Sequence, residues 1–176
     1  GHFFALCDRE RFDPLALMGS YAGAIGMPQF MPSSFLRYGV DFDGDGRVDL
    51  HDSAADVIGS VAHYLAEFGW QPGLPTHYAA SPPENLVERA RLLVPDIVPS
   101  FSADEFDAAG ARLEPAGRAH AGKLALIELP NGDAAPVHVA GTFNFYAITR
   151  YNWSSFYALA VIELGAALRR ELDRTA

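Results

Sequence analysis

The sequence is short of cysteine, of basic charge and of long apolar runs, and each shortage excludes a class of protein. Cys7 is the only cysteine, so an internal disulfide and a cysteine-only metal site are both excluded. A formal net charge of −9 argues against a nucleic-acid partner, because binding phosphates depends on a basic surface. No apolar run reaches roughly 18 residues, so we expect no transmembrane segment in this chain.

Apolar and aromatic residues are abundant enough to build a packed core. The chain of 176 residues is 49% apolar and contains twelve Phe, seven Tyr and two Trp. This length corresponds to about one domain, or to one domain with a modest insertion. We therefore expect a folded protein rather than a disordered chain. We also expect it to be a monomer.

Apolar residues at helical spacing predict three helices in the first 70 residues. The first covers Phe3–Arg11, the second begins within Met31–Ser34, and the third follows a cap at Ser53 and ends at Gly69. The side chains expected to face the core are Phe3, Phe4, Leu6 and Cys7, then Phe35, Leu36, Tyr38 and Val40, then Val57, Ile58, Val61, Tyr64, Leu65 and Phe68.

The composition changes between residues 71 and 140, where nine of the twelve prolines lie. A short helix is predicted over Pro83–Leu93. A second one is predicted after Ser102, because Ser102 and Glu105 have capping-box spacing and Gly110 can end the helix. Short helical signals separated by loops indicate an insertion of mixed structure.

A β-hairpin is predicted from Lys123–Leu129 and Val137–Thr142, with its turn at Asn131-Gly132. The last apolar segment, Trp153–Leu172, predicts a helix long enough to return to the first lobe. The expected organisation is a helical lobe (residues 1–70), an α+β insertion (residues 71–140) and a C-terminal segment whose helix returns to the core (residues 141–176).

An acidic loop from Asp41 to Asp52 matches the calcium-binding loop of EF-hands. Its carboxylates are two residues apart, Gly46 permits the sharp bend, and the backbone carbonyl of Arg47 supplies another oxygen. Residues 41–56 contain six aspartates, whose repulsion of roughly 1 kcal/mol per contacting pair a cation would remove. The pattern predicts a Ca²⁺ site that includes Asp41, Asp43, Asp45 and Arg47, and the alternative is a solvated acidic turn.

The residue that closes this loop departs from the EF-hand pattern. An EF-hand places a bidentate Glu at position 12, where this chain has the shorter Asp52. Asp56 competes with it, because the first turn of the next helix favours a carboxylate. We favour Asp56 and keep Asp52 as the alternative. The chain has no second loop of this kind, so we expect the ion to stabilise the fold, and we expect no organic cofactor.

A glycine-rich segment directly upstream, Ser20–Ser34, combines hydroxyl, amide and aromatic groups. Gln29 can donate and accept hydrogen bonds, which suits a sugar hydroxyl or N-acetyl group, and Phe30 offers a flat face for a pyranose ring. Together with the cation loop, this segment resembles the membrane-bound lytic murein transglycosylase B family. Later blocks in the same order extend the resemblance: Ile58–Tyr64 with Phe68–Trp70, and Phe143–Asn152 with Ser155–Ala158.

The resemblance implies an α+β fold that is mainly α-helical, with a lysozyme-like core, an EF-hand-like calcium loop and a small insertion carrying the β-hairpin. It also implies cleavage of the bond between N-acetylmuramic acid and N-acetylglucosamine in peptidoglycan without water. One glutamic acid protonates the leaving oxygen and then helps the sugar's own 6-hydroxyl close onto C1, which gives a 1,6-anhydromuramoyl product. The pKa of this acid must be raised above its usual value, so that the acid is protonated at the working pH.

The resemblance assigns site residues one by one. Those expected to line the sugar cleft are Ser20, Gln29, Phe30, Tyr64, Tyr151, Asn152 and Tyr157. Those expected to hold calcium are Asp41, Asp43, Asp45, the Arg47 carbonyl and Asp56, in a loop longer than the standard twelve residues. For each tyrosine the alternative is a core position with a satisfied hydroxyl.

The family's catalytic glutamate lies upstream of the block that begins at Gly19, in a Gly-x-Glu-Thr/Ser context, and no glutamate of this sequence has that context. We therefore expect a transglycosylase fragment that is inactive or very weak on its own. The substrate, peptidoglycan glycan strands, implies a periplasmic location, and an outer-membrane anchor on the parent protein is left open. Two other interpretations are a non-catalytic peptidoglycan-binding module and a calcium-responsive interaction protein.

Overall fold

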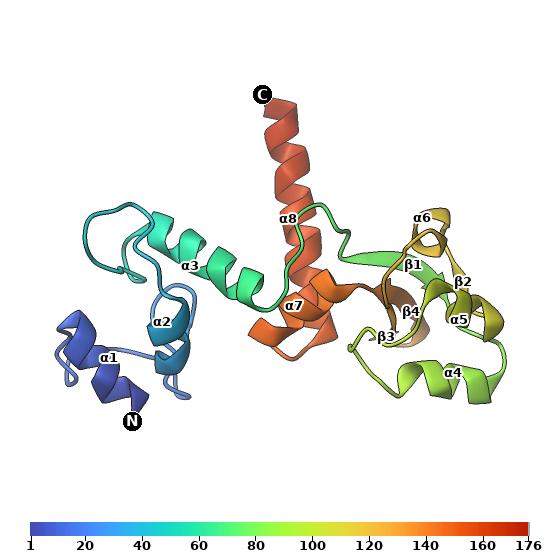
Figure 1. Ribbon diagram of the computed structural model, residues 1–176, viewed down its shortest axis with the longest axis horizontal. Helices are drawn as coiled ribbons and strands as arrows, with labels where there is room; N and C mark the ends of the chain where they lie inside the picture. Colours follow the sequence, from blue (N-terminus) through green and yellow to red (C-terminus); the bar gives the residue numbers. More distant parts are fainter. Residues whose placement is uncertain (176) are drawn as a thin grey trace. The chain divides into compact units, whose positions relative to one another are not determined.

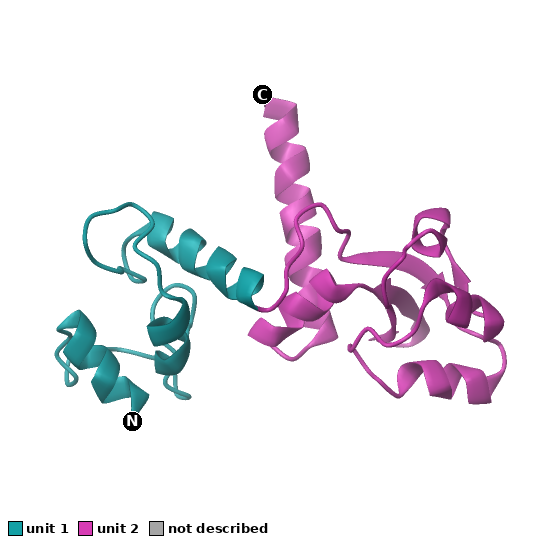
Figure 2. Ribbon diagram, viewed as in Figure 1, with its two compact units in different colours: residues 1–67 teal, residues 68–176 magenta. Residues whose placement is uncertain are grey.

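The computed structural model describes residues 1–175, and these fold into two compact units (Figures 1 and 2). The first unit covers residues 1–67 and the second begins at residue 68. The described residues form eight helices and four strands, and all four strands belong to the second unit. This mixture of helix and sheet confirms the predicted α+β class, in which helices predominate.

The first unit contains three helices with a small, largely aromatic core. Helix α1 covers His2–Glu10, α2 covers Pro32–Tyr38 and α3 covers Ala54–Glu67. Each helix, the segment before α2 and the loop before α3 contribute to the set of buried hydrophobic residues, which is Leu6, Cys7, Ile25, Phe30, Phe35, Tyr38, Leu50 and Tyr64. The three predicted helices are therefore confirmed, and the Ser53 hydroxyl accepts the backbone N–H of Asp56 as the expected cap.

Two residues predicted to face this core lie on the surface instead. Phe4 and Ile58 are each 67% exposed. The reason is that a unit of three short helices covers only a narrow stripe of each one. Phe4 packs edge-on against Phe3, with ring centroids 5.5 Å apart, and the core position belongs to Leu6. Helix α1 also ends one residue earlier than predicted, because Arg11 adopts a left-handed conformation with φ of 58°.

The second unit is built on a four-stranded antiparallel sheet with strand order β2-β1-β4-β3. The strands are β1 His77–Ser81, β2 Arg112–Leu113, β3 Ala125–Asn131 and β4 Ala134–Gly141. The predicted hairpin is confirmed as β3 and β4. Its turn is one residue later than predicted, because Asn131 pairs with Ala134 and leaves Gly132 and Asp133 between them. Gly132 has a φ of +55°, which glycine adopts without strain.

Helices α4 to α6 lie between β1 and β3 in the sequence. Helix α4 covers Leu86–Leu93, α5 covers Ala103–Ala108 and α6 covers Pro115–Arg118. The capping box predicted at Ser102 and Glu105 is confirmed, with both reciprocal hydrogen bonds present. Helix α4 begins later than the predicted Pro83, because the Asn85 side chain caps its first turn by accepting two backbone N–H groups.

Helices α7, Phe143–Tyr151, and α8, Ser155–Thr175, complete the second unit. The sequence predicted α8 nearly in full, but Ala158 is its one buried residue in the described chain. No helix within residues 1–175 is long and apolar enough to cross a membrane. The three-part division of the chain, and the return of α8 to the first lobe, stay predictions.

Candidate functional site

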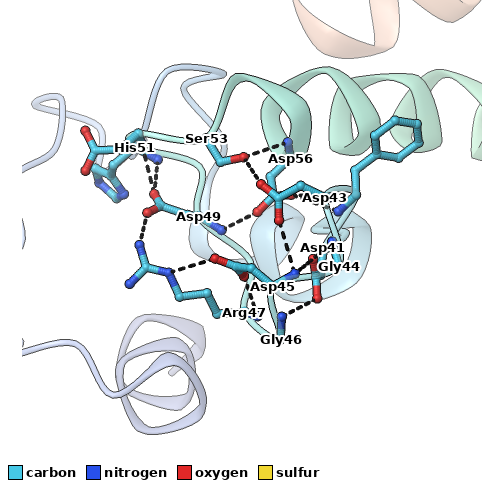
Figure 3. A network of polar contacts seen from close by, with 12 residues as sticks. Asp41, Asp43, Gly44, Asp45, Gly46, Arg47, Asp49, His51, Ser53 and Asp56 are labelled. Atoms are coloured by element: carbon cyan, nitrogen blue, oxygen red, sulfur yellow. Dashed lines mark hydrogen bonds and ion pairs between the residues drawn. The ribbon is translucent and has the colours of Figure 1, made fainter.

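Three carboxylates from the acidic loop and the following helix converge on one point (Figure 3). Asp41 and Asp43 lie in the loop, Asp56 lies in the first turn of α3, and one oxygen of each is within 4.8 Å of the others. Two oxygens bound to the same Ca²⁺ are at most about 5 Å apart, because each Ca–O distance is about 2.3–2.6 Å. The separation therefore fits one hard cation.

Asp56 is fully buried and is the centre of the hydrogen bonds that shape the loop (Figure 3). Its Oδ1 accepts the backbone N–H of Phe42 at 2.8 Å, and its Oδ2 accepts that of Asp49 at 2.7 Å. Burial raises the pKa of Asp56, but the N–H groups of Asp49, Phe42 and Asp43 together outweigh burial and hold the pKa below its usual value. Asp56 is therefore ionised at neutral pH, as a cation ligand must be.

Asp41 and Asp43 are held in place by the loop itself. Asp41 accepts the backbone N–H of Gly44 at 2.6 Å on one oxygen and that of Gly46 at 2.9 Å on the other. Gly44 and Gly46 have φ values of +77° and +94°, which residues with a side chain rarely adopt. The bend predicted at Gly46 is therefore confirmed, and it points both oxygens of Asp41 into the loop.

Ser53 has a role in this site that the sequence did not indicate. The sequence predicted Ser53 only as a helix cap. Its hydroxyl accepts the N–H of Asp56 at 3.2 Å and also donates to the Asp43 carboxylate at 2.7 Å. One side chain thus fixes both a loop carboxylate and the start of α3. The signal that could have found it is the cap position beside an acidic loop, because a capping hydroxyl still has its own proton to donate.

Of the other predicted ligands, the Asp45 carboxylate lies outside the three-carboxylate cluster. Asp45 accepts the backbone N–H of Arg47 at 3.0 Å, and its carboxylate lies 3.9 Å from the Arg47 guanidinium. Arg47 also pairs with Asp49, whose pKa is lowered chiefly by the backbone N–H of Asp52, with burial opposing. Asp52 itself is exposed and is not part of the cluster, so the geometry favours Asp56 as the closing ligand.

The glycine-rich segment lies directly against the acidic loop. Met27 donates its backbone N–H to the carbonyl of Leu50 at 2.8 Å. A Cβ atom at Gly26 would lie 2.6 Å from the same carbonyl oxygen, so this close approach requires glycine. The predicted sugar-binding segment and the cation loop therefore support each other within the first unit.

Four predicted sugar-binding residues lie in this unit, and two of them are on its surface. Ser20 and Gln29 are exposed, and the Gln29 side chain donates to the carbonyl of Gly26 at 2.9 Å. Phe30 and Tyr64 are only 3% and 8% exposed, and their ring centroids are 5.6 Å apart. The Phe30 ring is thus covered rather than open in this structure, and its contact with a sugar stays a prediction.

The other three predicted sugar-binding residues, Tyr151, Asn152 and Tyr157, lie where α7 ends and α8 begins. The rings of Tyr151 and Tyr157 are stacked, with centroids 6.5 Å and planes 10° apart. Asn152 directly follows α7 and is exposed. The predicted sugar-binding residues are therefore divided between the two units.

Comparison with known proteins identifies the class. Residues 1–166 match the family described as the transglycosylase SLT domain, so the chain belongs to this family of lytic transglycosylase domains. Among its members it is similar to the membrane-bound lytic murein transglycosylase B of Escherichia coli (strain K12). The two are 39% identical over 167 residues, which cover 94% of this chain and 44% of that protein. The resemblance that the sequence motifs indicated is therefore confirmed.

Solved structures of related enzymes have the same lysozyme-like fold. SltB1 from Pseudomonas aeruginosa has a TM-score of 0.84 and 39% identity, over 99% of this chain and 56% of that one. Escherichia coli Slt35 in complex with calcium has a TM-score of 0.82 and 37% identity, over 99% of this chain and 53% of the Slt35 chain. SltB3 from Pseudomonas aeruginosa in complex with NAG-anhNAM-pentapeptide has a TM-score of 0.73 and 32% identity, over 91% of this chain and 42% of the SltB3 chain. The present chain spans about half the length of these relatives.

Proposed function

We propose that this chain is the part of a lytic murein transglycosylase that binds the glycan strands of peptidoglycan. The observation that carries the proposal is the match of residues 1–166 to the transglycosylase SLT domain. Two relatives support the substrate, since one is named a murein transglycosylase and another was solved with a sugar–peptide ligand. Because murein lies in the bacterial periplasm, we infer a periplasmic location.

The proposed reaction cleaves the bond between N-acetylmuramic acid and N-acetylglucosamine without water. A carboxylic acid donates its proton to the glycosidic oxygen while the C1–O bond breaks, and N-acetylglucosamine leaves as an alcohol. The resulting carboxylate accepts the proton of the muramic acid 6-hydroxyl, whose oxygen bonds to C1 and closes a 1,6-anhydro ring. One carboxyl group is enough, because the nucleophile belongs to the sugar.

The glutamates of this chain do not have the environment that such an acid needs. A general acid at neutral pH requires a raised pKa, which burial supplies. All nine glutamates lie within the described residues; seven are exposed, while Glu10 and Glu88 are half-buried and each pairs with a neighbouring arginine. Hydrogen bonds from Lys123 and Ser102 lower the pKa of Glu105 to about 2, the opposite of what the reaction requires. We therefore propose that these 176 residues bind glycan but do not cleave it alone.

Calcium is the cation that we propose for Asp41, Asp43 and Asp56. Their oxygens suit a hard ion that accepts six to eight oxygen ligands in flexible geometry, and the related Slt35 was solved in complex with calcium. The Arg47 carbonyl and the Asp45 carboxylate would add further ligands. The bound ion would neutralise the crowded carboxylates and stabilise the loop that supports the glycine-rich segment, without taking part in the reaction.

Incubation with purified peptidoglycan separates binding from turnover. We expect the chain to sediment with insoluble peptidoglycan, and we expect EDTA to reduce the sedimented fraction. Mass spectrometry of the soluble fraction should detect no 1,6-anhydromuropeptides above the level of a buffer control. Absence of sedimentation would contradict the proposed function, whereas robust release would show that another residue of this chain serves as the acid.

A pair of variants tests whether the glycine-rich segment takes part in binding. Gln29 has a φ of +52°, a conformation that asparagine tolerates, so Gln29→Asn shortens the side chain without straining the backbone. We expect this variant to sediment less with peptidoglycan. Leu15→Ala is the matched control, since Leu15 is an exposed residue of the same unit outside the segment. Equal sedimentation of the two variants would remove Gln29 from the binding site.

A further inference from the structure

We propose that Trp153 is a further sugar-binding residue, whose indole ring stacks on a pyranose ring of the glycan strand beside Tyr151 and Asn152. Trp153 lies in the short turn between α7 and α8, directly after Asn152. The inference rests on the proposed function, because it requires a glycan strand bound to the second unit. It adds a sugar-binding residue that the sequence motifs did not indicate.

The indole ring of Trp153 is accessible, and one of its faces contacts Arg150. Trp153 is 57% exposed although it is a large aromatic residue. The guanidinium carbon of Arg150 lies 4.8 Å from the Trp153 ring centre and 5.3 Å from the Tyr146 ring centre. The same guanidinium donates a hydrogen bond to the Tyr146 hydroxyl at 3.3 Å. Arg150 therefore supports one face of the indole, which lowers the entropy cost of placing a ligand on the ring.

The turn that carries Trp153 is tied down by hydrogen bonds. Ser154 donates its backbone N–H to the carbonyl of Asn152 at 2.7 Å, and its side-chain oxygen accepts the N–H of Tyr157 at 3.2 Å. Ala158 donates its N–H to the carbonyl of Ser154 at 3.0 Å and is fully buried. These hydrogen bonds order the backbone on either side of Trp153, between Asn152 and Tyr157, two of the predicted sugar-binding residues.

A β-linked N-acetylhexosamine has the chemistry to bind this ring. When the substituents of a pyranose are equatorial, its axial C–H bonds form flat apolar faces, and an indole offers a matching apolar surface with one N–H donor. The Asn152 amide next to it can pair with a hydroxyl or N-acetyl group. The second tryptophan, Trp70, is half-buried against the core of this unit, so Trp153 is the tryptophan that presents a ring to a ligand.

Nuclear magnetic resonance of the full chain tests the inference, because two tryptophans give two indole N–H signals. The Trp153 signal is the one that disappears in Trp153→Phe. The probe is a GlcNAc–MurNAc tetrasaccharide that carries its peptides. We expect it to shift the Trp153 signal and to leave the Trp70 signal in place.

Calorimetry with the same tetrasaccharide gives the energetic test. Trp153→Ala should raise Kd about tenfold, in the range expected for loss of one aromatic stacking contact. Trp153→Phe should keep most of the affinity. Phe143→Ala is the matched control, because Phe143 is an exposed aromatic residue at the opposite end of α7. The Kd of this variant for the tetrasaccharide should equal that of the wild type.

The results separate this inference from the proposed function. If the wild-type chain and Trp153→Ala bind the tetrasaccharide equally and the indole signal does not move, Trp153 is not a sugar-binding residue and the proposed function stands. If the wild-type chain binds neither the tetrasaccharide nor insoluble peptidoglycan, both proposals are wrong. Circular dichroism shows whether the alanine variant is folded, and the indole shift is measured on the unaltered chain.

Discussion

The buried carboxylate of Asp56 accepts the backbone N–H of Asp49 at 2.7 Å, and this contact closes the acidic loop onto α3. The second oxygen of Asp56 accepts the N–H of Phe42 at 2.8 Å, so one side chain holds both ends of the loop. These contacts are made by protein groups alone. Asp56 therefore has a structural role that is separable from any role as a cation ligand.

Asp56→Asn should destabilise the first unit in the absence of metal. The variant replaces one acceptor oxygen with an NH₂ group, which then faces a backbone N–H and leaves it without an acceptor. Loss of a buried, charge-assisted hydrogen bond costs about 2–3 kcal/mol of unfolding free energy. Denaturant unfolding in EDTA measures this, with the exposed Asp52→Asn as control, expected within about 0.5 kcal/mol of wild type. Equal midpoints for the two variants would contradict the structural role.

Calcium should raise the melting temperature of the wild-type chain. At a free calcium concentration of 100 times Kd, linkage adds about 2.7 kcal/mol to the unfolding free energy. Asp43 belongs to the cluster and is exposed, so Asp43→Asn should remove most of the rise without burying an unpaired group, whereas Asp52→Asn should keep it. Thermal melts with and without calcium check this. A rise kept in Asp43→Asn and lost in Asp52→Asn would place the ion on Asp52.

Features that depend on neighbouring residues could be predicted from the sequence. The capping box of Ser102 and Glu105 spans three residues, and the structure contains it. The carboxylates of Asp41, Asp43 and Asp56 come from one short stretch of chain, and they lie together. In each case the spacing along the chain already determines which groups can meet, so the local pattern was sufficient.

Features that depend on distant residues could not be predicted in this way. Strand β1 pairs with β4 through Tyr78 and Ala140, and nothing within the five residues of β1 indicates that partner. The sequence predicts an open ring face at Phe30, but Tyr64 from α3 packs against it. The same limit explains why the prediction for Ile58 was wrong. Its helical spacing predicts burial, but its exposure depends on which elements pack beside α3.

Asn144→Ala should destabilise the second unit, although Asn144 belongs to the same sequence block as the predicted sugar ligand Asn152. The buried Asn144 side chain accepts the N–H of Gln71 at 2.8 Å and donates to the carbonyls of Gln71 and Leu74 at 2.8 and 2.7 Å. Alanine would leave three backbone groups without their partner, at a cost of roughly 3 kcal/mol in denaturant unfolding.

The exposed Asn152 is the matched comparison for this variant. Asn152→Ala should leave the unfolding free energy within about 0.5 kcal/mol of wild type and should weaken glycan binding instead. Calorimetry and denaturant unfolding of both variants give the complete comparison. A fully stable Asn144→Ala chain with impaired glycan binding would move Asn144 from the structural set to the sugar site.

The stability difference between wild type and Glu105→Gln should depend on pH in the acid range. Lys123 Nζ lies 2.8 Å from the Glu105 carboxylate and is the largest cause that lowers the pKa of Glu105 from 4.5 to about 2. The backbone N–H of Ser102, 2.7 Å from the same carboxylate, is the second largest cause of this lowered pKa. Because the folded-state pKa lies below the unfolded one, this stabilisation is complete above pH 4.5 and is lost as the pH falls from 4.5 to about 2.

Unfolding free energies of the two chains, measured from neutral pH down to about pH 2, test this window. The difference between them should be constant at neutral pH and should shrink below pH 4.5, as the carboxylate takes up a proton. Lys123→Gln should raise the pKa of Glu105 and narrow the window, because it removes the largest cause of the shift. If the difference is the same at both ends of the pH range, the carboxylate has equal pKa values in the folded and unfolded chains, and its ion pair does not stabilise the start of α5.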